Sequence, residues 1–376
     1  MRQTLAIFLD AYRELNARKL FWITLILSGV VVLAFSAVGI NEKGLTLLWF
    51  EFPSALNTTL FPAESFYKWA FVAFGIKFWL TWAASILALV STAGIFPEFV
   101  SSGSIELLLS KPIGRLRLFL TKYLAGLLFV VLQVSVFTLA CFLVIGLRGK
   151  SWEPGLFWAV PITVLFFSYL FSICALIGLL TRSTIAALLL TLLCWFGIFG
   201  IHATEMTMLT FRERAQLRVE ALEARIARLE ARLAERAAAS SDQNGDQADP
   251  PAPDRDAERL AADRQKLTEE RSTLASLRKW HAGIFAAKSI LPKTAETTQL
   301  LEHTLLSVTD MERLRGRDNT PDPMPSGDIR ISGAELTKRI DKIQRSRTVP
   351  WVIGTSLAFQ AVVLAISAWF FCRRDF

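Results

Sequence analysis

Six long apolar runs constrain the fold of this chain more than any other feature of its sequence. A helix needs about 20 consecutive apolar residues to cross a lipid bilayer, and each run approaches or exceeds that length. Despite a long polar segment between the last two runs, the chain is 53% hydrophobic and has a mean hydropathy of +0.41. The sequence therefore predicts an all-α, polytopic membrane protein with six transmembrane helices. The runs are Leu20–Ile40, Trp69–Phe96, Lys122–Leu147, Leu156–Leu180, Ile185–Ala203 and Pro350–Cys372.

Lysine and arginine are distributed unequally among the short segments that flank these runs. With a cytoplasmic N-terminus, the short segments on the cytoplasmic side carry eleven Lys and Arg, and those on the other side carry four. Short loops rich in Lys and Arg stay on the cytoplasmic side. We therefore expect a multi-pass protein of the bacterial inner membrane with both termini in the cytoplasm.

The formal net charge of +8 lies almost entirely on the membrane part, because the polar segment 204–349 is nearly neutral. This distribution favours anionic lipid headgroups as partners and argues against nucleic acid. Three parts follow from the pattern. Residues 1–203 hold the first five helices, 204–349 form an extracytoplasmic insert, and 350–376 hold the sixth helix and a cytoplasmic tail.

Apolar residues recur at alternating spacings of three and four where the insert begins, which is typical of a coiled coil. Residues 237–256 are small, polar and proline-rich and predict a flexible tip, after which a weaker apolar series returns. The simplest arrangement is an antiparallel coiled-coil hairpin within one chain, and pairing with a second copy is the alternative. Short helices are expected near Leu300–Leu306 and Leu336–Ile343. The predicted seam consists of Val219, Leu222, Ile226, Leu229, Leu233, Leu260, Leu267 and Leu274.

A basic, amphipathic segment, residues 97–121, separates the second and third runs. Its core reads GSIELLLSKPIGR and resembles the first cytoplasmic loop of ABC-2-type transporter permeases, which typically reads G-T-L-E-L-L-L-S-x-P-I-S-R. Glu98 matches an acidic residue that the family places before the glycine. The resemblance covers the membrane part of the chain, and the 204–349 insert departs from it. It implies that the matching residues form the segment on which a separate ATPase docks: Glu98, Gly103, Ser104, Ile105, Glu106, Leu107, Leu108, Leu109, Ser110, Lys111, Pro112 and Arg115.

The chain carries no complete motif for catalysis. Gly149-Lys150-Ser151 ends like a phosphate-binding loop, but the first glycine of that motif is replaced by Val144. His202, His281 and His303 do not form a metal-binding signature. We therefore expect no enzyme, no metal and no cofactor in this chain, with ATP and Mg²⁺ bound by the partner ATPase.

The resemblance implies a permease subunit that works with a second permease copy or a paralogue. Lys77 and Gln133 lie within predicted spans and are candidates for a translocation path, although a lysine can also extend to the membrane surface and a glutamine can join two helices. Two other functions stay open. The ATPase cycle could move the external coiled coil without transporting a solute, or the chain could anchor an extracytoplasmic protein.

Overall fold

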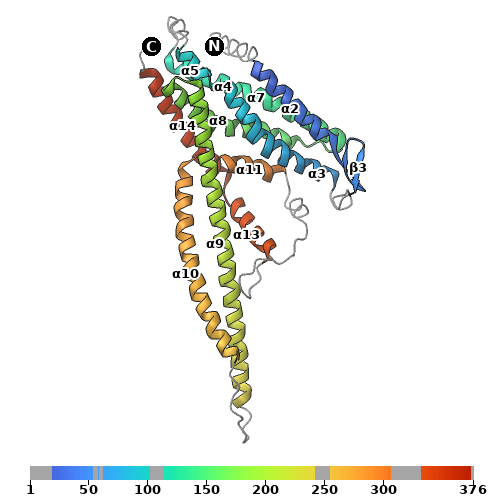
Figure 1. The fold of residues 1–376 in the computed structure, drawn as a ribbon, viewed down its shortest axis with the longest axis vertical. Helices are drawn as coiled ribbons and strands as arrows, with labels where there is room; N and C mark the ends of the chain where they lie inside the picture. The colour runs from blue at the N-terminus through green and yellow to red at the C-terminus, as the bar shows by residue number, and fades with distance from the viewer. Residues whose placement is uncertain are drawn as a thin grey trace. The chain divides into compact units, whose positions relative to one another are not determined.

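The computed structural model describes residues 19–53, 58, 62–101, 114–241, 255–305 and 332–373. The chain divides into two units (Figure 1). Unit 1 comprises Met1–Gly200, Ser289–Arg317 and Val349–Phe376, and unit 2 comprises Ile201–Lys288 and Asp318–Thr348. The α-helices are α2 (Lys19–Ala37), α3 (Ala63–Ala70), α4 (Ser85–Thr92), α5 (Ile95–Ser101), α7 (Arg115–Arg148), α8 (Ala159–Thr181), α9 (Thr184–Ser241), α10 (Arg255–Ile290), α11 (Thr294–Leu305), α13 (Gly333–Arg345) and α14 (Val349–Arg373). A π-helix, η1 (Phe71–Ala84), and a 3₁₀-helix, η2 (Pro154–Trp158), complete the helical elements of the described residues.

Six helical segments of the described chain are long and apolar enough to cross a membrane. The prediction of a mostly helical protein with several apolar helices of membrane-spanning length is therefore confirmed. These segments are Lys19–Ala37, Ala63–Val100, Arg115–Arg148, Pro154–Thr181, Thr184–Ala238 and Val349–Arg373.

A three-stranded antiparallel sheet follows α2 directly and was not predicted. Its strands are β1 (Val38–Asn41), β2 (Gly44–Leu47) and β3 (Phe50–Pro53), joined in the order β1-β2-β3. Each strand has only four residues and each connection only two, too short to stand out beside the apolar runs. An all-α description is therefore too narrow for this part of the chain.

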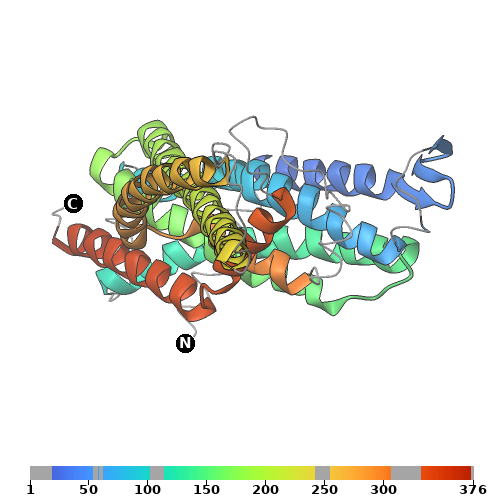
Figure 2. The same cartoon turned by 90° about the horizontal axis from the view of Figure 1, so that it is seen from below.

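Unit 1 packs around α8, which contacts α5, α7, α11 and α14. In both views α2, η1 and α7 lie side by side (Figures 1 and 2). Close approach of α7 to α8 depends on Gly126, where an added Cβ would lie 2.6 Å from the ring of Phe171. Small residues commonly allow such close packing of apolar helices.

Helix α11 belongs to unit 1, although its sequence falls within the predicted polar insert. It contacts α8, η1 and α14, and both Leu301 and Leu305 are buried. The amphipathic helix expected near Leu300 is thus present. Its packing against the apolar helices was not foreseen.

Most of α9 and α10, from Ile201 to Lys288, belongs to unit 2, where the two antiparallel helices lie side by side (Figure 1). Of the seam residues predicted on α9, Val219, Leu222, Ile226 and Leu229 are buried and Leu233 is half-buried. On α10, Leu274 is buried, and Leu260 and Leu267 are half-buried.

Ion pairs replace apolar contacts where the α10 series is interrupted by polar residues. Asp263 is buried, and its Oδ2 lies 2.9 Å from Nε of Arg225. From Arg218 to Arg236 on α9, the partners on α10 run from Glu270 back to Asp256, so the two helices are antiparallel. Further cross-helix pairs along this stretch include Arg218–Glu270, Glu223–Arg271, Glu230–Arg264 and Arg236–Asp256.

Candidate functional site

Most of the residues that carry the resemblance, Gly103 to Pro112, lie outside the described residues. The structure does describe both flanks. Helix α5 leads into the segment, and α7 begins at Arg115 immediately after it.

Three helix ends meet at these flanks. Arg115 at the start of α7 donates a hydrogen bond from its guanidinium to the carbonyl oxygen of Cys372 at 2.9 Å. The ring of Phe371 in α14 stacks on Phe99 of α5 with centroids 6.2 Å apart, and it also contacts Phe119 of α7 at 5.8 Å. These contacts therefore connect the ends of α5, α7 and α14.

Glu98 lies in the first turn of α5 and is exposed. An acidic side chain in this position is stabilised by the helix dipole. The carboxylate of Glu98 folds back over Gly94. A Cβ added to Gly94 would clash with Oε1 of Glu98, so a larger residue there would require the carboxylate to move. These contacts account for Glu98 structurally, whether or not it meets a partner.

The two candidates for a translocation path are held in separate interactions. Lys77, on η1, pairs with Glu302 of α11 at 2.7 Å and keeps about half of its side chain exposed. Gln133, on α7, is buried and donates to the carbonyl oxygen of Phe21 at 3.3 Å. Gln133 also lines a small cavity of about 10 Å³, which is room for at most about one water molecule. The two side chains are therefore not brought together into one path.

A closed polar triangle joins α7, α8 and α14 inside unit 1. The hydroxyl of Tyr123 donates to the carbonyl oxygen of Ser168 at 2.8 Å, and Gln360 donates to the Tyr123 oxygen at 3.0 Å. Ser168 in turn donates to Oε1 of Gln360 at 3.1 Å. Because buried polar groups must find partners, this triangle fixes the register of three apolar helices.

Lys293 is the most deeply buried cation of unit 1 among the described residues, with 1% of its surface exposed. Its ammonium group donates to the carbonyl oxygen of Ser289 at 3.2 Å and lies 4.5 Å from the centroid of the Trp351 ring. Its backbone N–H donates to the hydroxyl of Ser356 on α14 at 2.9 Å. Lys293 thus fastens the start of α11 to α14.

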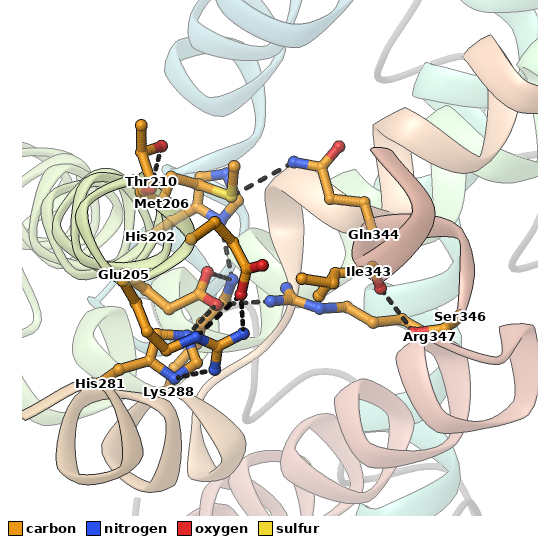
Figure 3. Close-up of polar contacts among 12 residues, drawn as sticks. His202, Glu205, Met206, Thr210, His281, Lys288, Ile343, Gln344, Ser346 and Arg347 are labelled. Atoms are coloured by element: carbon orange, nitrogen blue, oxygen red, sulfur yellow. Dashed lines mark hydrogen bonds and ion pairs between the residues drawn. The ribbon is translucent and has the colours of Figure 1, made fainter. Parts of the chain in front are cut away.

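The largest concentration of buried charge in the described part of unit 2 surrounds Glu205 on α9 (Figure 3). Glu205 is fully buried and uses both carboxylate oxygens. Oε2 accepts from Lys288 of α10 at 2.9 Å, and Oε1 accepts from Arg347, which follows α13. We call Glu205, Lys288, Arg347 and His281 the Glu205 cluster.

The Glu205 cluster connects three chain segments, two of which border apolar runs. Glu205 follows the fifth run by two residues, and Arg347 precedes α14 by two residues. Lys288 also contacts Nδ1 of His202 at 2.9 Å. Both oxygens of the only carboxylate in the cluster are occupied by cations. The arrangement is therefore suited to holding these segments together.

His281 completes the cluster in one tautomer. Arg212 lies 3.2 Å from Nδ1 of His281, so this nitrogen acts as the acceptor. The ring proton of a neutral imidazole is then on Nε2, which lies 3.4 Å from Oε1 of Glu205. Burial lowers the pKa of His281, and the adjacent positive charge of Arg212 lowers it further.

This lowered pKa predicts that stability depends on pH. An unfolded histidine binds a proton near pH 6.5, whereas folded His281 binds it only at lower pH, so its contribution is present above about pH 6.5 and is lost as the pH falls through the folded pKa. Melting of the full-length protein should shift to lower temperature between pH 7.5 and 5.5, and His281→Gln should reduce that shift. An unchanged shift in the variant would exclude His281 as its source.

Comparison with known proteins gives no further assignment, because no protein-family model, curated protein or solved structure matches this chain. The candidate roles therefore depend on the sequence pattern of the 97–121 segment and on the geometry of the described residues. Sequence reasoning missed the Glu205 cluster, the Lys77–Glu302 pair and Lys293. Each of these joins residues that lie far apart along the chain.

Proposed function

We propose that this chain is the permease subunit of an ABC-2-type transporter, driven by a separate ATPase that docks on the loop between its second and third spans. The observation that carries the proposal is the ordered string Gly103–Arg115, placed between two apolar runs on the side with more basic residues. The working unit contains two permease chains, identical or paralogous, and two ATPase chains. ATP and Mg²⁺ bind to the ATPase, in the cytoplasm.

The described flanks support a route from the loop into the helices. The segment enters from α5 and leaves into α7, and Arg115 and Phe371 hold both flanks against the end of α14. Closure of the ATPase dimer would push on the segment, and three helix ends would respond as one body. The amphipathic pattern of the sequence predicts an apolar face with Ile105, Leu108 and Leu109, directed to the membrane or a neighbouring helix, and a polar face with Glu106, on which the ATPase would dock.

Purification of the full-length protein from its own membranes tests this function. The proposal expects an ATPase with a phosphate-binding loop to co-purify in an amount equal to the permease. Its ATP hydrolysis should respond to lipid or solute. Stoichiometric recovery of an external protein with no ATPase would instead favour the anchor function.

A second candidate function is mechanical transmission to the extracytoplasmic side, and one observation favours it. Helix α9 runs from Thr184 to Ser241, so a single helix contains both the fifth apolar run and the first arm of the insert. Within unit 2, the Glu205 cluster joins this helix to α10 and to Arg347, which precedes α14. ATP hydrolysis that is insensitive to lipid and solute but lost when the insert is deleted would distinguish this function from transport.

We further propose that α9 and α10 form the predicted coiled-coil hairpin within one chain, outside the cytoplasm. The buried Ala215, Val219 and Leu274 and the adjacent Leu267 and Leu277 support this packing. The cross-helix ion pairs support an antiparallel register.

A cysteine pair at Val219 and Leu274 tests whether the pairing is intramolecular. In the full-length protein, Val219→Cys/Leu274→Cys joined by a short thiol crosslinker should stay at monomer mass. After cleavage at a protease site placed within residues 242–254, the two fragments should remain linked until the thiols are reduced. An exposed pair at different levels of the hairpin, Arg228→Cys/Arg278→Cys, is the negative control and should not crosslink. Crosslinking at twice the monomer mass would show that the helices pair between copies.

A further inference from the structure

The β-sheet that follows α2 presents an apolar face. In a strand successive side chains alternate between the two faces. The pairs Val38–Leu47, Ile40–Leu45, Leu45–Phe52 and Leu47–Phe50 place six apolar residues on one face. The opposite face carries Asn41, Thr46 and Glu51, and Glu51 pairs with Lys43 at 3.1 Å.

One end of this apolar face is buried in the core of unit 1, and the other end, on β3, is exposed. Ile40 is buried in the core, and Val38 and Leu45 pack against it. On the outer strand Phe50 and Phe52 are 69% and 54% exposed, and Trp49 in the turn is 86% exposed. An exposed apolar patch of this kind marks an interaction surface.

The turn between β2 and β3 is made of Leu48 and Trp49, residues that such turns disfavour. Two-residue hairpin turns usually contain Asn and Gly, because they require positive φ. Leu48 adopts φ 56° and is 54% exposed. A bulky apolar residue at positive φ is strained, and its exposure to water adds a second cost. The second cost is removed if the turn lies in an apolar environment.

The position of the turn identifies that environment. The backbone N–H of Leu48 donates to the carbonyl oxygen of Ala37, the last residue of α2, at 2.8 Å. Helix α2 has 19 residues and is therefore about 28 Å long, close to the thickness of the hydrocarbon core. The turn lies at the end of this apolar helix, opposite Lys19, at the level of a membrane surface.

Neighbouring contacts fix the sheet at this level. Arg148 at the end of α7 donates to the carbonyl oxygen of Ser36, and Tyr67 donates to that of Val38 at 3.2 Å. The chain that follows α7 presents Trp152 and Trp158, which are 56% and 61% exposed. Exposed tryptophans at the ends of apolar helices are typical of the membrane interface.

We propose that Leu47, Leu48, Trp49, Phe50 and Phe52 form a lipid-inserted tip, in which the apolar face of the sheet enters the phospholipid interface beside α2. The partner is the lipid surface itself. Lys43 and Glu51, on the other face, remain in the headgroup region or in water. This inference rests on the proposed membrane placement of α2 and is independent of the ATPase.

Site-directed spin labelling in phospholipid nanodiscs tests the tip. In a background without Cys141, Cys174, Cys194 and Cys372, single cysteines are introduced at Trp49, Phe50, Leu33 and Glu42. Labels at 49 and 50 should show a ratio of oxygen to nickel-chelate accessibility several-fold higher than a label at Glu42, the exposed turn on the other side of the sheet. A label at Leu33, on the exposed face of α2, reports the membrane placement.

Each outcome decides a separate point. Lipid exposure at Leu33 with water exposure at 49 and 50 would overturn the tip and leave the membrane placement intact. Water exposure at Leu33 would overturn the membrane placement. Low accessibility to both reagents at 49, with disulfide dimers of Trp49→Cys, would assign the tip to an interface between copies.

A second measurement uses the protein with its own cysteines. The fluorescence of Trp49 is obtained as the difference between the emission of the unchanged protein and that of Trp49→Phe. Lipids brominated near the headgroup should quench this difference. The fluorescence of Trp152, obtained in the same way from Trp152→Phe, is the matched reference and should be quenched to the same extent. An unquenched Trp49 difference would contradict lipid insertion.

Discussion

Replacing Glu205 with alanine is expected to destabilise the protein by about 3–5 kcal/mol, the cost of removing one partner from a buried ion pair. The substitution removes the carboxylate that Lys288 and Arg347 share. Their side chains are only 5% and 11% exposed, respectively. Thermal melting and protease resistance of the full-length protein measure the effect. Glu205→Gln should be milder, because the amide oxygen still accepts one hydrogen bond.

Glu220 provides the matched control on the same helix. It pairs with Arg339 of α13, but its side chain is 43% exposed. Exposed pairs contribute at most about 1 kcal/mol, so Glu220→Ala should change melting only slightly. Equal losses in Glu205→Ala and Glu220→Ala would contradict the bracing role of the Glu205 cluster.

Glu106→Arg and Leu108→Asp are each expected to abolish stimulated ATP hydrolysis by the complex while membrane insertion is retained. Glu106→Arg reverses a charge on the proposed docking face. Leu108→Asp places a charge on the apolar face, where desolvating it is costly. Glu42→Arg makes the same charge reversal at an exposed turn of the β-sheet and should leave hydrolysis unchanged. Full activity and normal assembly in both loop variants would refute docking on this segment.

Regular helical and apolar patterns could be predicted from the sequence, because they depend on residues close together along the chain. The apolar runs gave the long helices of unit 1, and the spacing from Val219 to Leu229 identified the buried side of α9. The helices near Leu301 and Leu336 were predicted for the same reason. The sheet was missed because its strands are short and its second turn, Leu48-Trp49, lacks the usual Asn-Gly signal.

Long-range charge pairing could not be predicted, because periodicity carries no information about it. Glu302 meets Lys77 only because α11 packs on η1, and nothing near Lys77 in the sequence indicates this. The Glu205 cluster is formed by residues of α9 and α10 and by Arg347, which lies two residues before α14. A usable signal was present, since Glu205 and Arg347 are charges placed within a few residues of apolar runs, where charged groups are costly without partners.

The proposal that an ATPase docks on residues 97–121 is based on the sequence of this segment. The structure adds the contacts of the helices that flank it. The hydrogen bond of Arg115 to Cys372 and the stacking of Phe371 on Phe99 connect residues more than 250 positions apart. Neither contact follows from the amphipathic pattern of residues 97–121. Under the proposal, both contacts would transmit a displacement of this loop to α14 as well as to α5 and α7.

Photo-crosslinking from the loop tests the central claim most directly. A photoreactive amino acid is placed at Leu107 in the full-length protein, with Glu42 as the control position, and the membranes are irradiated before purification. The proposal predicts a single adduct at Leu107 with an ATPase that contains a phosphate-binding loop, and none at Glu42. Adducts at Leu107 with lipid alone, in membranes that contain that ATPase, would contradict it.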